Sequence, residues 1–163
     1  MAAPRNRPGI PASRAVDASM VPRLAVLHAL CFDEAWGEAA IAGLLAMPGA
    51  FGYMAGPDDA PDGFVLARLG GGEAEILTIC VAPAARRSGL GRHLLQAAAA
   101  SAVAAGAEAL FLEVAEDNPA AIRLYERFGF VLVGIRPAYY ARGTSRVAAR
   151  TLRYDLPPPV NLS

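Results

Sequence analysis

Two strand-like segments, each followed by a helical pattern, occupy the centre of the chain and constrain its fold more than any other feature. The run Glu75–Val81 is apolar and contains β-branched residues, as buried strands do. An alanine-rich helical segment follows and closes at Gly106, and a second apolar run covers 109–114. Because a connection of helical length joins the two runs, they are predicted to lie parallel in one sheet. The chain is therefore expected to be a mixed α/β protein.

Helix and turn signals extend this pattern in both directions. Asn118 followed by Pro119 is a strong helix start, because Asn caps the first turn and proline fits the first helical position. This helix is expected to run to about Phe128 and to stop at Gly129. The remaining signals predict helices over 21–30 and 38–46 and strands over 13–16, 51–55, 64–69, 130–136 and 148–155. The outer strands are expected to be antiparallel.

The length and composition of the chain predict a single domain, and its terminal stretches predict tails on either side of it. At 163 residues, of which 55% are hydrophobic, the chain fits one soluble domain. The stretch from Met1 to Arg14 carries three prolines and three arginines, but no acid and no apolar centre of a secretory signal. Residues 1–12 are therefore predicted to be a disordered tail, with a transit peptide as the alternative, residues 13–157 the domain, and residues 158–163 a short second tail.

Composition also excludes several classes of function. The formal net charge is zero, whereas nucleic-acid-binding domains are usually basic. No run of about 18 apolar residues could span a membrane, and the absence of lysine excludes Schiff-base chemistry on that side chain. Cys31 and Cys80 lie far apart in the sequence, and with only His28 and His93 beside them neither a disulfide framework nor a metal site is expected. We expect a reduced cytoplasmic protein with Cys80 in its core, and no nucleic-acid or membrane partner.

The turn between the first central strand and its helix reads RRSGLGR and begins at Arg86. Gly89 and Gly91 allow backbone conformations and close approaches that a Cβ would obstruct. A helix that begins near Leu90 leaves its first N–H groups without intrahelical partners, and these donors suit a phosphate, as does the positive end of the helix dipole. The three arginines of the segment add positive charge. The turn is either an anion site or an ordinary strand–helix connection with solvated arginines.

Three further residues are candidates for chemistry, and each also has a purely structural interpretation. Glu113 lies within an apolar run, where burial disfavours the charged form of a carboxylate and favours a role as a base; alternatively, it reaches water at the edge of the strand. Tyr125 shares a helix face with Ile122 and Phe128, as a core aromatic residue would. Asn118 is sufficiently explained as a helix cap.

The order and spacing of these motifs resemble the GNAT superfamily of acetyl-CoA-dependent N-acetyltransferases. The segment from Arg86 to Gly91 fits its coenzyme A signature, which is an Arg or Gln, two residues, Gly, one residue, and then Gly or Ala. The segment LEVAEDNPAAIRLYERFGF followed by IRPAYY is similar to the RimI type, which acetylates the N-terminal alanine of a small-subunit ribosomal protein. This close similarity covers 77–140. The implied fold is the GNAT fold, a mixed central sheet with a splayed parallel strand pair flanked by helices.

The resemblance implies a site for acetyl-CoA and names its residues. Main-chain groups of the first central strand would pair with the pantetheine arm, main-chain donors of the glycine turn would hold the pyrophosphate, and Asn118 would contact the cofactor. Glu113 matches the general base of RimI-type enzymes and Tyr125 the general acid. No metal is implied, and no cysteine nucleophile is required if the amine attacks the thioester directly. The implied contacts in strand and turn are Ile79, Cys80, Val81, Arg87, Ser88, Gly89, Leu90, Gly91 and Arg92.

The sequence leaves several classes of acceptor open. The resemblance implies a protein N-terminus that begins with alanine, with Tyr139 and Tyr140 as aromatic walls beside it; ordinary strand packing would explain these tyrosines equally well. Many RimI-type sequences carry an acidic pair after this position, whereas this chain reads ARGTSRVAARTLRYDL. The alternatives are another protein N-terminus, a small-molecule amine, and a non-catalytic sensor that binds acetyl-CoA.

Overall fold

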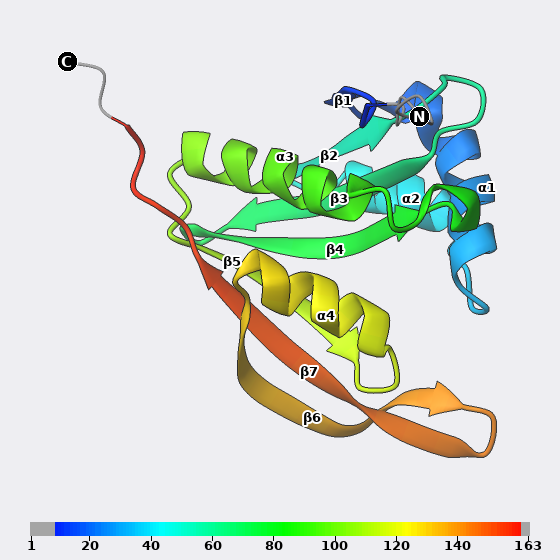
Figure 1. Cartoon of the computed structure of the whole chain (residues 1–163), viewed down its shortest axis with the longest axis vertical. Helices are drawn as coiled ribbons and strands as arrows, with labels where there is room; N and C mark the ends of the chain where they lie inside the picture. Colours follow the sequence, from blue (N-terminus) through cyan, green and yellow to red (C-terminus); the bar gives the residue numbers. More distant parts are fainter. Residues whose placement is uncertain (1–8, 161–163) are drawn as a thin grey trace, which may run out of the picture.

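A computed structural model describes residues 9–160, and within this range seven strands form one sheet in the order β1-β2-β3-β4-β5-β7-β6 (Figure 1). The strands are β1 (Ser13–Ala15), β2 (Ala50–Ala55), β3 (Gly63–Gly70), β4 (Glu73–Val81), β5 (Ala109–Ala115), β6 (Val131–Arg142) and β7 (Ser145–Asp155). Neighbouring strands are antiparallel except β4 and β5, which are parallel. The mixed α/β sheet with a central parallel pair is therefore confirmed. Most of the predicted N-terminal tail, residues 1–8, lies outside the described residues.

Helices cover both faces of this sheet. They are α1 (Val21–Cys31), α2 (Glu38–Leu45), α3 (Leu90–Ala104) and α4 (Pro119–Phe128), with single 3₁₀ turns at η1 (Ala18–Met20) and η2 (Pro83–Ala85). In Figure 1, α3 and α4 lie in front of the sheet and α2 lies behind it. Among residues 9–160, no helix is both long and apolar enough to cross a membrane.

The alternation of side chains along β3 explains this layered arrangement. Val65 and Ala67 are buried in the core under α3 and α4, which also holds Leu94. Phe64 and Leu66 point to the opposite face and are buried with Leu24 and Ile41 of α1 and α2. Because successive side chains of a strand point to opposite faces, an almost uninterrupted apolar strand requires cover on both sides.

The C-terminal hairpin is longer than the sequence predicted. We expected strands over 130–136 and 148–155, but β6 continues to Arg142 and β7 begins at Ser145. Proline cannot donate to a strand ladder, so Pro137 signalled an end to the strand. Instead, β6 bulges: pairing jumps from Arg136 to Tyr140, and Ala138 takes a left-handed conformation with φ +50°. This correction places both Tyr139 and Tyr140 inside β6.

Candidate active site

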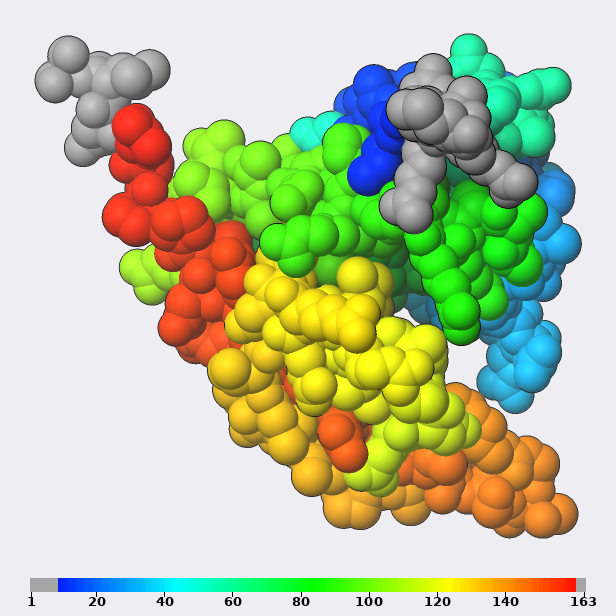
Figure 2. Space-filling model, in the orientation of Figure 1, coloured from blue at the N-terminus to red at the C-terminus, as the bar shows by residue number. Residues whose placement is uncertain are grey.

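The two parallel strands separate soon after they meet. Pairing joins Ala74–Ile76 of β4 to Leu110–Leu112 of β5, although both strands continue, to Val81 and to Ala115. Figure 1 shows the two strands diverging, and Figure 2 shows the surface hollowed between the green segment that follows β4 and the yellow-green end of β5. The predicted splayed pair is therefore present, and Glu113 is the first residue of β5 beyond the paired part.

The end of β4 presents alternate peptide groups to this opening. The Ala82 N–H donates to the carbonyl of Asp62, the residue just before β3 (2.7 Å), so the Val81 carbonyl of the same trans peptide points away from β3. The Cys80 carbonyl points toward β3, because it lies 2.9 Å from the position that a Cβ on Gly63 would take. Three strand residues are predicted to contact the cofactor. The main-chain groups of Val81 therefore face the opening, and those of Ile79 do so by alternation. The main-chain groups of Cys80 face β3 instead.

The glycine turn has the backbone geometry of an anion site. Gly89 adopts a left-handed conformation (φ +87°) directly before α3, which begins at Leu90 as predicted. No side chain caps the first turn of this 15-residue helix through Gly89. Arg87 is also left-handed (φ +60°), and the Ser88 hydroxyl donates to the Ala85 carbonyl (2.6 Å), which fixes the turn between them. The Leu90 N–H donates to the Ser88 hydroxyl (3.4 Å), so the following N–H groups of the first turn, at Gly91 and Arg92, are the ones open to an anion.

The three arginines of the turn have different environments. Arg86 Nε donates to the Val81 carbonyl (3.1 Å), so its side chain folds back on the end of β4. Arg92 lies over the Phe128 ring at 5.5 Å and donates to the Arg127 carbonyl (3.5 Å), so it is directed toward α4. The Arg87 side chain is exposed. The turn is positively charged as expected, but two of its three guanidinium groups already have partners.

Glu113 forms an ion pair that sequence reasoning missed. Its Oε1 lies 3.1 Å from Nε of Arg136 on β6, and the Glu113 side chain is 23% exposed. The carboxylate is thus neither fully buried nor fully solvated. Its environment is intermediate between the buried base and the solvated strand-edge residue that the sequence left open. Arg136 also lies over the Tyr139 ring at 5.4 Å. Its only sequence signal is its position just before the tyrosine pair, at the last residue of the strand predicted over 130–136.

Tyr125 is both a core residue and a candidate acid. It is 6% exposed and packs edge-on against Phe130, with ring centroids 5.8 Å apart. Burial raises the pKa of its hydroxyl above the usual range, and the neighbouring Cys80 and Tyr140 add to this shift. The hydroxyl therefore keeps its proton at neutral pH, close to β4 and to the tyrosine pair of β6.

The tyrosine pair of β6 lies next to these groups. Tyr140 is half-buried, and burial raises the pKa of its hydroxyl, with further contributions from the negative charge of Glu113 and from Tyr139. The two rings meet edge to face, with centroids 5.1 Å apart. Arg142 lies over the Tyr140 ring at 5.5 Å and pairs with Asp117 at 2.8 Å. Although β7 separates β6 from β5 in the sheet, the bulge brings Tyr140 within electrostatic range of Glu113.

Asn118 caps α4 as predicted. Its Oδ1 accepts a hydrogen bond from the Ala121 N–H (3.2 Å), and the residue itself is exposed. Among residues 9–160, no three His, Cys, Asp or Glu side chains are grouped in the manner of a metal site.

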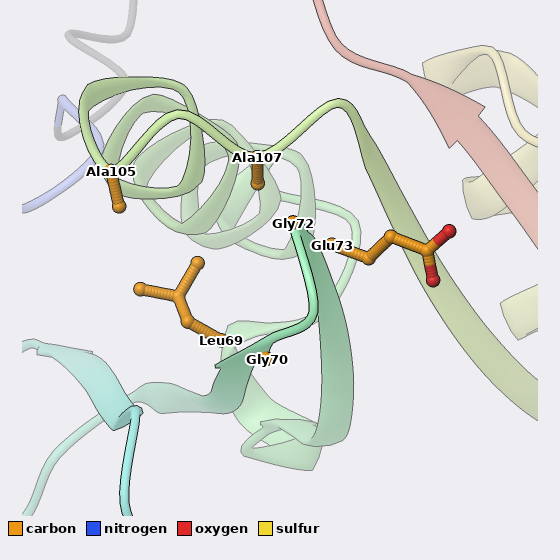
Figure 3. Close-up of a pocket in the computed structure, with 6 residues that line it drawn as sticks. All are labelled: Leu69, Gly70, Gly72, Glu73, Ala105 and Ala107. Carbon is orange, nitrogen blue, oxygen red and sulfur yellow. The ribbon is translucent and has the colours of Figure 1, made fainter.

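Two cavities lie outside this cluster. One of about 250 Å³ sits at the opposite end of β4, between the β3–β4 turn and the end of α3. Figure 3 shows it lined by small and apolar residues, with the Glu73 carboxylate turned away from Leu69 and Ala105. The second, of about 420 Å³, lies between α3, α4 and the end of β7 and is bordered by Arg92 and Phe128. Neither contains the residues that the sequence singled out for catalysis.

The pH dependence of stability tests the buried state of Tyr125. In the unfolded chain a tyrosine loses its proton near its ordinary pKa of 10.0, whereas the buried hydroxyl keeps its proton to higher pH. Above this pH the native state binds more protons, so the free energy of unfolding should fall with rising pH, by at most about 1.4 kcal/mol per pH unit. Urea titrations should show a shallower fall for Tyr125→Phe and an unchanged one for the exposed Tyr139→Phe. Equal slopes for Tyr125→Phe and wild type would contradict this assignment.

Known proteins resemble this chain in sequence. The chain matches the acetyltransferase (GNAT) family over residues 21–130. N-alpha-acetyltransferase RimI of Mycobacterium tuberculosis is 36% identical over 143 residues, which cover 84% of this chain and 87% of that protein. The ribosomal protein bS18-alanine N-acetyltransferase of Salmonella typhimurium is 40% identical over 83 residues, which cover 51% of this chain and 56% of that protein.

The solved structures agree with this relationship at the level of the fold. The crystal structure of the ribosomal-protein-S18-alanine N-acetyltransferase from Escherichia coli matches with a TM-score of 0.84 at 24% identity, over 93% of this chain and 97% of that one. The chain spans less than two thirds of the length of several curated relatives that it matches. The family match nevertheless covers most of the chain, and its range includes the glycine turn, Glu113 and Tyr125. The chain therefore belongs to the acetyltransferase (GNAT) family, as its motifs predicted.

Proposed function

We propose that this protein transfers the acetyl group of acetyl-CoA to the N-terminal α-amine of a protein, with alanine as the preferred first residue. One observation carries the proposal. The opening between β4 and β5 lies beside the start of α3, where the N–H groups of Gly91 and Arg92 have no side-chain cap, and a partly exposed carboxylate and a protonated, buried tyrosine stand next to it. An anion cradle, a proton acceptor and a proton donor are the groups that acetyl transfer from a thioester to an amine requires.

The residues present fit acetyl-CoA. The pyrophosphate would accept hydrogen bonds from the first N–H groups of α3, at Gly91 and Arg92, where the left-handed Gly89 leaves room for it. The neighbouring Arg87 would add charge. Of the strand groups, the Val81 carbonyl already accepts from Arg86, so the Val81 N–H and the main chain of Ile79 remain to pair with the pantetheine arm. Asn118, which caps α4, would contact the cofactor from the other side.

Glu113 and Tyr125 would then divide the proton transfers. A free α-amine has a pKa of about 8 and is mostly protonated at neutral pH, so it must lose a proton before it can attack the thioester carbonyl. Glu113 would accept that proton, directly or through a water, while Arg136 holds the carboxylate in place. Tyr125 would donate to the departing sulfur, whose basicity also rises in an apolar environment.

The relatives support the choice of acceptor. The N-alpha-acetyltransferase and the bS18-alanine N-acetyltransferases act, by those names, on α-amines and on an alanine of a ribosomal protein. An opening between two separated strands favours a narrow, extended nucleophile over a bulky one. Tyr139 and Tyr140 would flank the first peptide residues. We therefore propose a small-subunit ribosomal protein as the acceptor in the cell.

Substitution of Gly89 tests the cofactor cradle. Gly89→Val places a branched side chain where the pyrophosphate would lie, so calorimetry should show acetyl-CoA affinity reduced by at least about tenfold, the cost of about one to two hydrogen bonds. Gly106→Val is the matched control, because Gly106 is also left-handed (φ +82°) and follows the same helix, with no atom within 4 Å of the position that a Cβ would take. Unchanged affinity in a folded Gly89→Val protein would rule out this cradle.

The acid–base assignments are tested by turnover at saturating acetyl-CoA. Glu113→Gln keeps the size of the side chain but removes its basicity, and should lower turnover by about a hundredfold or more while acetyl-CoA affinity stays near that of wild type. Tyr125→Phe keeps the packing against Phe130 and removes only the hydroxyl, and should also act mainly on turnover. Wild-type rates in both variants would refute both roles.

A peptide mixture tests the acceptor. Peptides that begin with Ala should be acetylated faster than those that begin with Leu or Glu, because a bulky first side chain adds a steric cost in a narrow opening. Lysine side chains should be poor acceptors. Mass spectrometry locates the acetyl group on each peptide, and a parallel reaction offers polyamines. Acetylation mainly of internal lysines or of polyamines would assign the protein to a different class of acceptor.

A further inference from the structure

The two cysteines of the chain belong to one packed cluster beside the candidate cofactor strand, although 48 residues separate them in the sequence. Cys31 is the last residue of α1, and its thiol donates to the Val81 carbonyl (Sγ–O 3.4 Å). Arg86 Nε donates to the same carbonyl oxygen at 3.1 Å. Cys31 packs against the core cluster under α1 and α2, to which Cys80 on β4 belongs. One carbonyl at the opening thus gathers both a thiol and a guanidinium group, and a second thiol lies in the same cluster.

The two thiols differ in access to solvent. Cys31 is partly exposed, whereas Cys80 is 2% exposed and belongs to the core under α1 and α2. Cys80 Sγ lies 3.9 Å from Thr78 Oγ1, which in turn lies 3.4 Å from Nε2 of His28. The Trp36 N–H donates to Nδ1 of His28 (3.0 Å). This series of polar contacts, from Trp36 through His28 and Thr78, holds the Cys80 side chain in place, while the Cys31 thiol is the more accessible of the two.

The surroundings also differ in their effect on ionisation. The neighbouring Cys80 lowers the pKa of the Cys31 thiol to about 6, and the Arg86 guanidinium contributes to the same shift. Cys31 and burial raise the pKa of Cys80, which stays a thiol. Since the thiolate is the nucleophilic form of cysteine, Cys31 is the sulfur that reacts first and Cys80 the one that follows. The mechanism proposed above uses neither thiol.

We propose that Cys31 and Cys80 form an oxidisable pair, which peroxides convert to an intramolecular disulfide. Cys31 sulfur attacks one oxygen of the peroxide; the O–O bond breaks, an S–O bond forms, and hydroxide leaves. Cys80 sulfur then attacks the Cys31 sulfenic acid; the S–S bond forms, the S–O bond breaks, and the departing hydroxide takes the proton of Cys80 as water. For hydrogen peroxide the sum is two thiols and one peroxide to one disulfide and two waters, in which sulfur is oxidised and the peroxide reduced.

The disulfide would alter the edge of β4 that faces the opening. Cys31 must leave the Val81 carbonyl, so that this oxygen keeps only Arg86 as a partner, and the end of α1 becomes linked to β4. This consequence rests on the proposed pairing of Ile79 and Val81 with the pantetheine arm. Oxidised protein should therefore bind acetyl-CoA more weakly, by about tenfold, which corresponds to about one lost hydrogen bond.

Mass spectrometry tests the pair itself, independently of any activity. Full-length reduced protein is treated with hydrogen peroxide, the peroxide is removed, and remaining thiols are blocked with N-ethylmaleimide in denaturant. Wild type should lose two hydrogen atoms and take up no maleimide, and dithiothreitol should reverse both changes. Cys80→Ser should stop at a sulfenic acid on Cys31 that dimedone traps, and Cys31→Ser should keep a Cys80 thiol that resists peroxide. Two maleimide-reactive thiols in treated wild type, or oxidation of Cys80 in Cys31→Ser as fast as in wild type, would overturn the proposal.

Calorimetry then tests the consequence for the cofactor. Reduced wild type and Cys31→Ser should bind acetyl-CoA alike, and only wild type should lose affinity after peroxide treatment. Equal affinity of reduced and disulfide-linked wild type would overturn the link to the cofactor site. Failure of the reduced protein to bind acetyl-CoA would instead refute the proposed function. The mass spectrometry would still test the thiol pair, because it does not depend on acetyl-CoA.

Discussion

The short parallel ladder between β4 and β5 is the constraint on which the rest of the site depends. A sheet normally satisfies the peptide groups of neighbouring strands along their common length. Here pairing stops at Ile76 and Leu112 while both strands continue, so alternate peptide groups of β4 face an opening rather than a strand. Side chains supply some of the missing partners, as Arg86 and Cys31 do at the Val81 carbonyl. The remaining groups are available to a ligand.

The charged and aromatic groups around the opening follow from this separation. Glu113 can reach the opening because it is the first residue of β5 beyond the paired part, and β6 approaches it through its bulge. Arg136 and Arg142 on β6 pair with Glu113 and Asp117, which lie on and just after the end of β5. Acidic groups on one side and arginines on the other thus neutralise each other, and ion pairs rather than buried apolar contacts hold this side of the opening.

Local patterns in the sequence predicted the features that local physics determines. The start of α3 at Leu90, the left-handed Gly89 and the Asn118 cap all follow from neighbouring residues, and so does the parallel pair. Contacts between distant segments could not be predicted in this way. Arg136 meets Glu113 only because β6 continues through a bulge at Pro137, and Cys31 lies near Cys80 only because α1 ends against β4. These contacts depend on register and packing, which no short motif encodes.

Hydrogen–deuterium exchange of main-chain amides, with and without saturating acetyl-CoA, tests the central claim most directly. If the cofactor lies in the opening with its pyrophosphate at the start of α3, exchange should slow at Val81 and over Gly89–Arg92. Amides of the distant β1 and β2 strands, at the far edge of the sheet, serve as the internal reference and should not change. Unchanged exchange at both Val81 and the start of α3, or protection confined to the cavity between α3, α4 and β7, would contradict the account.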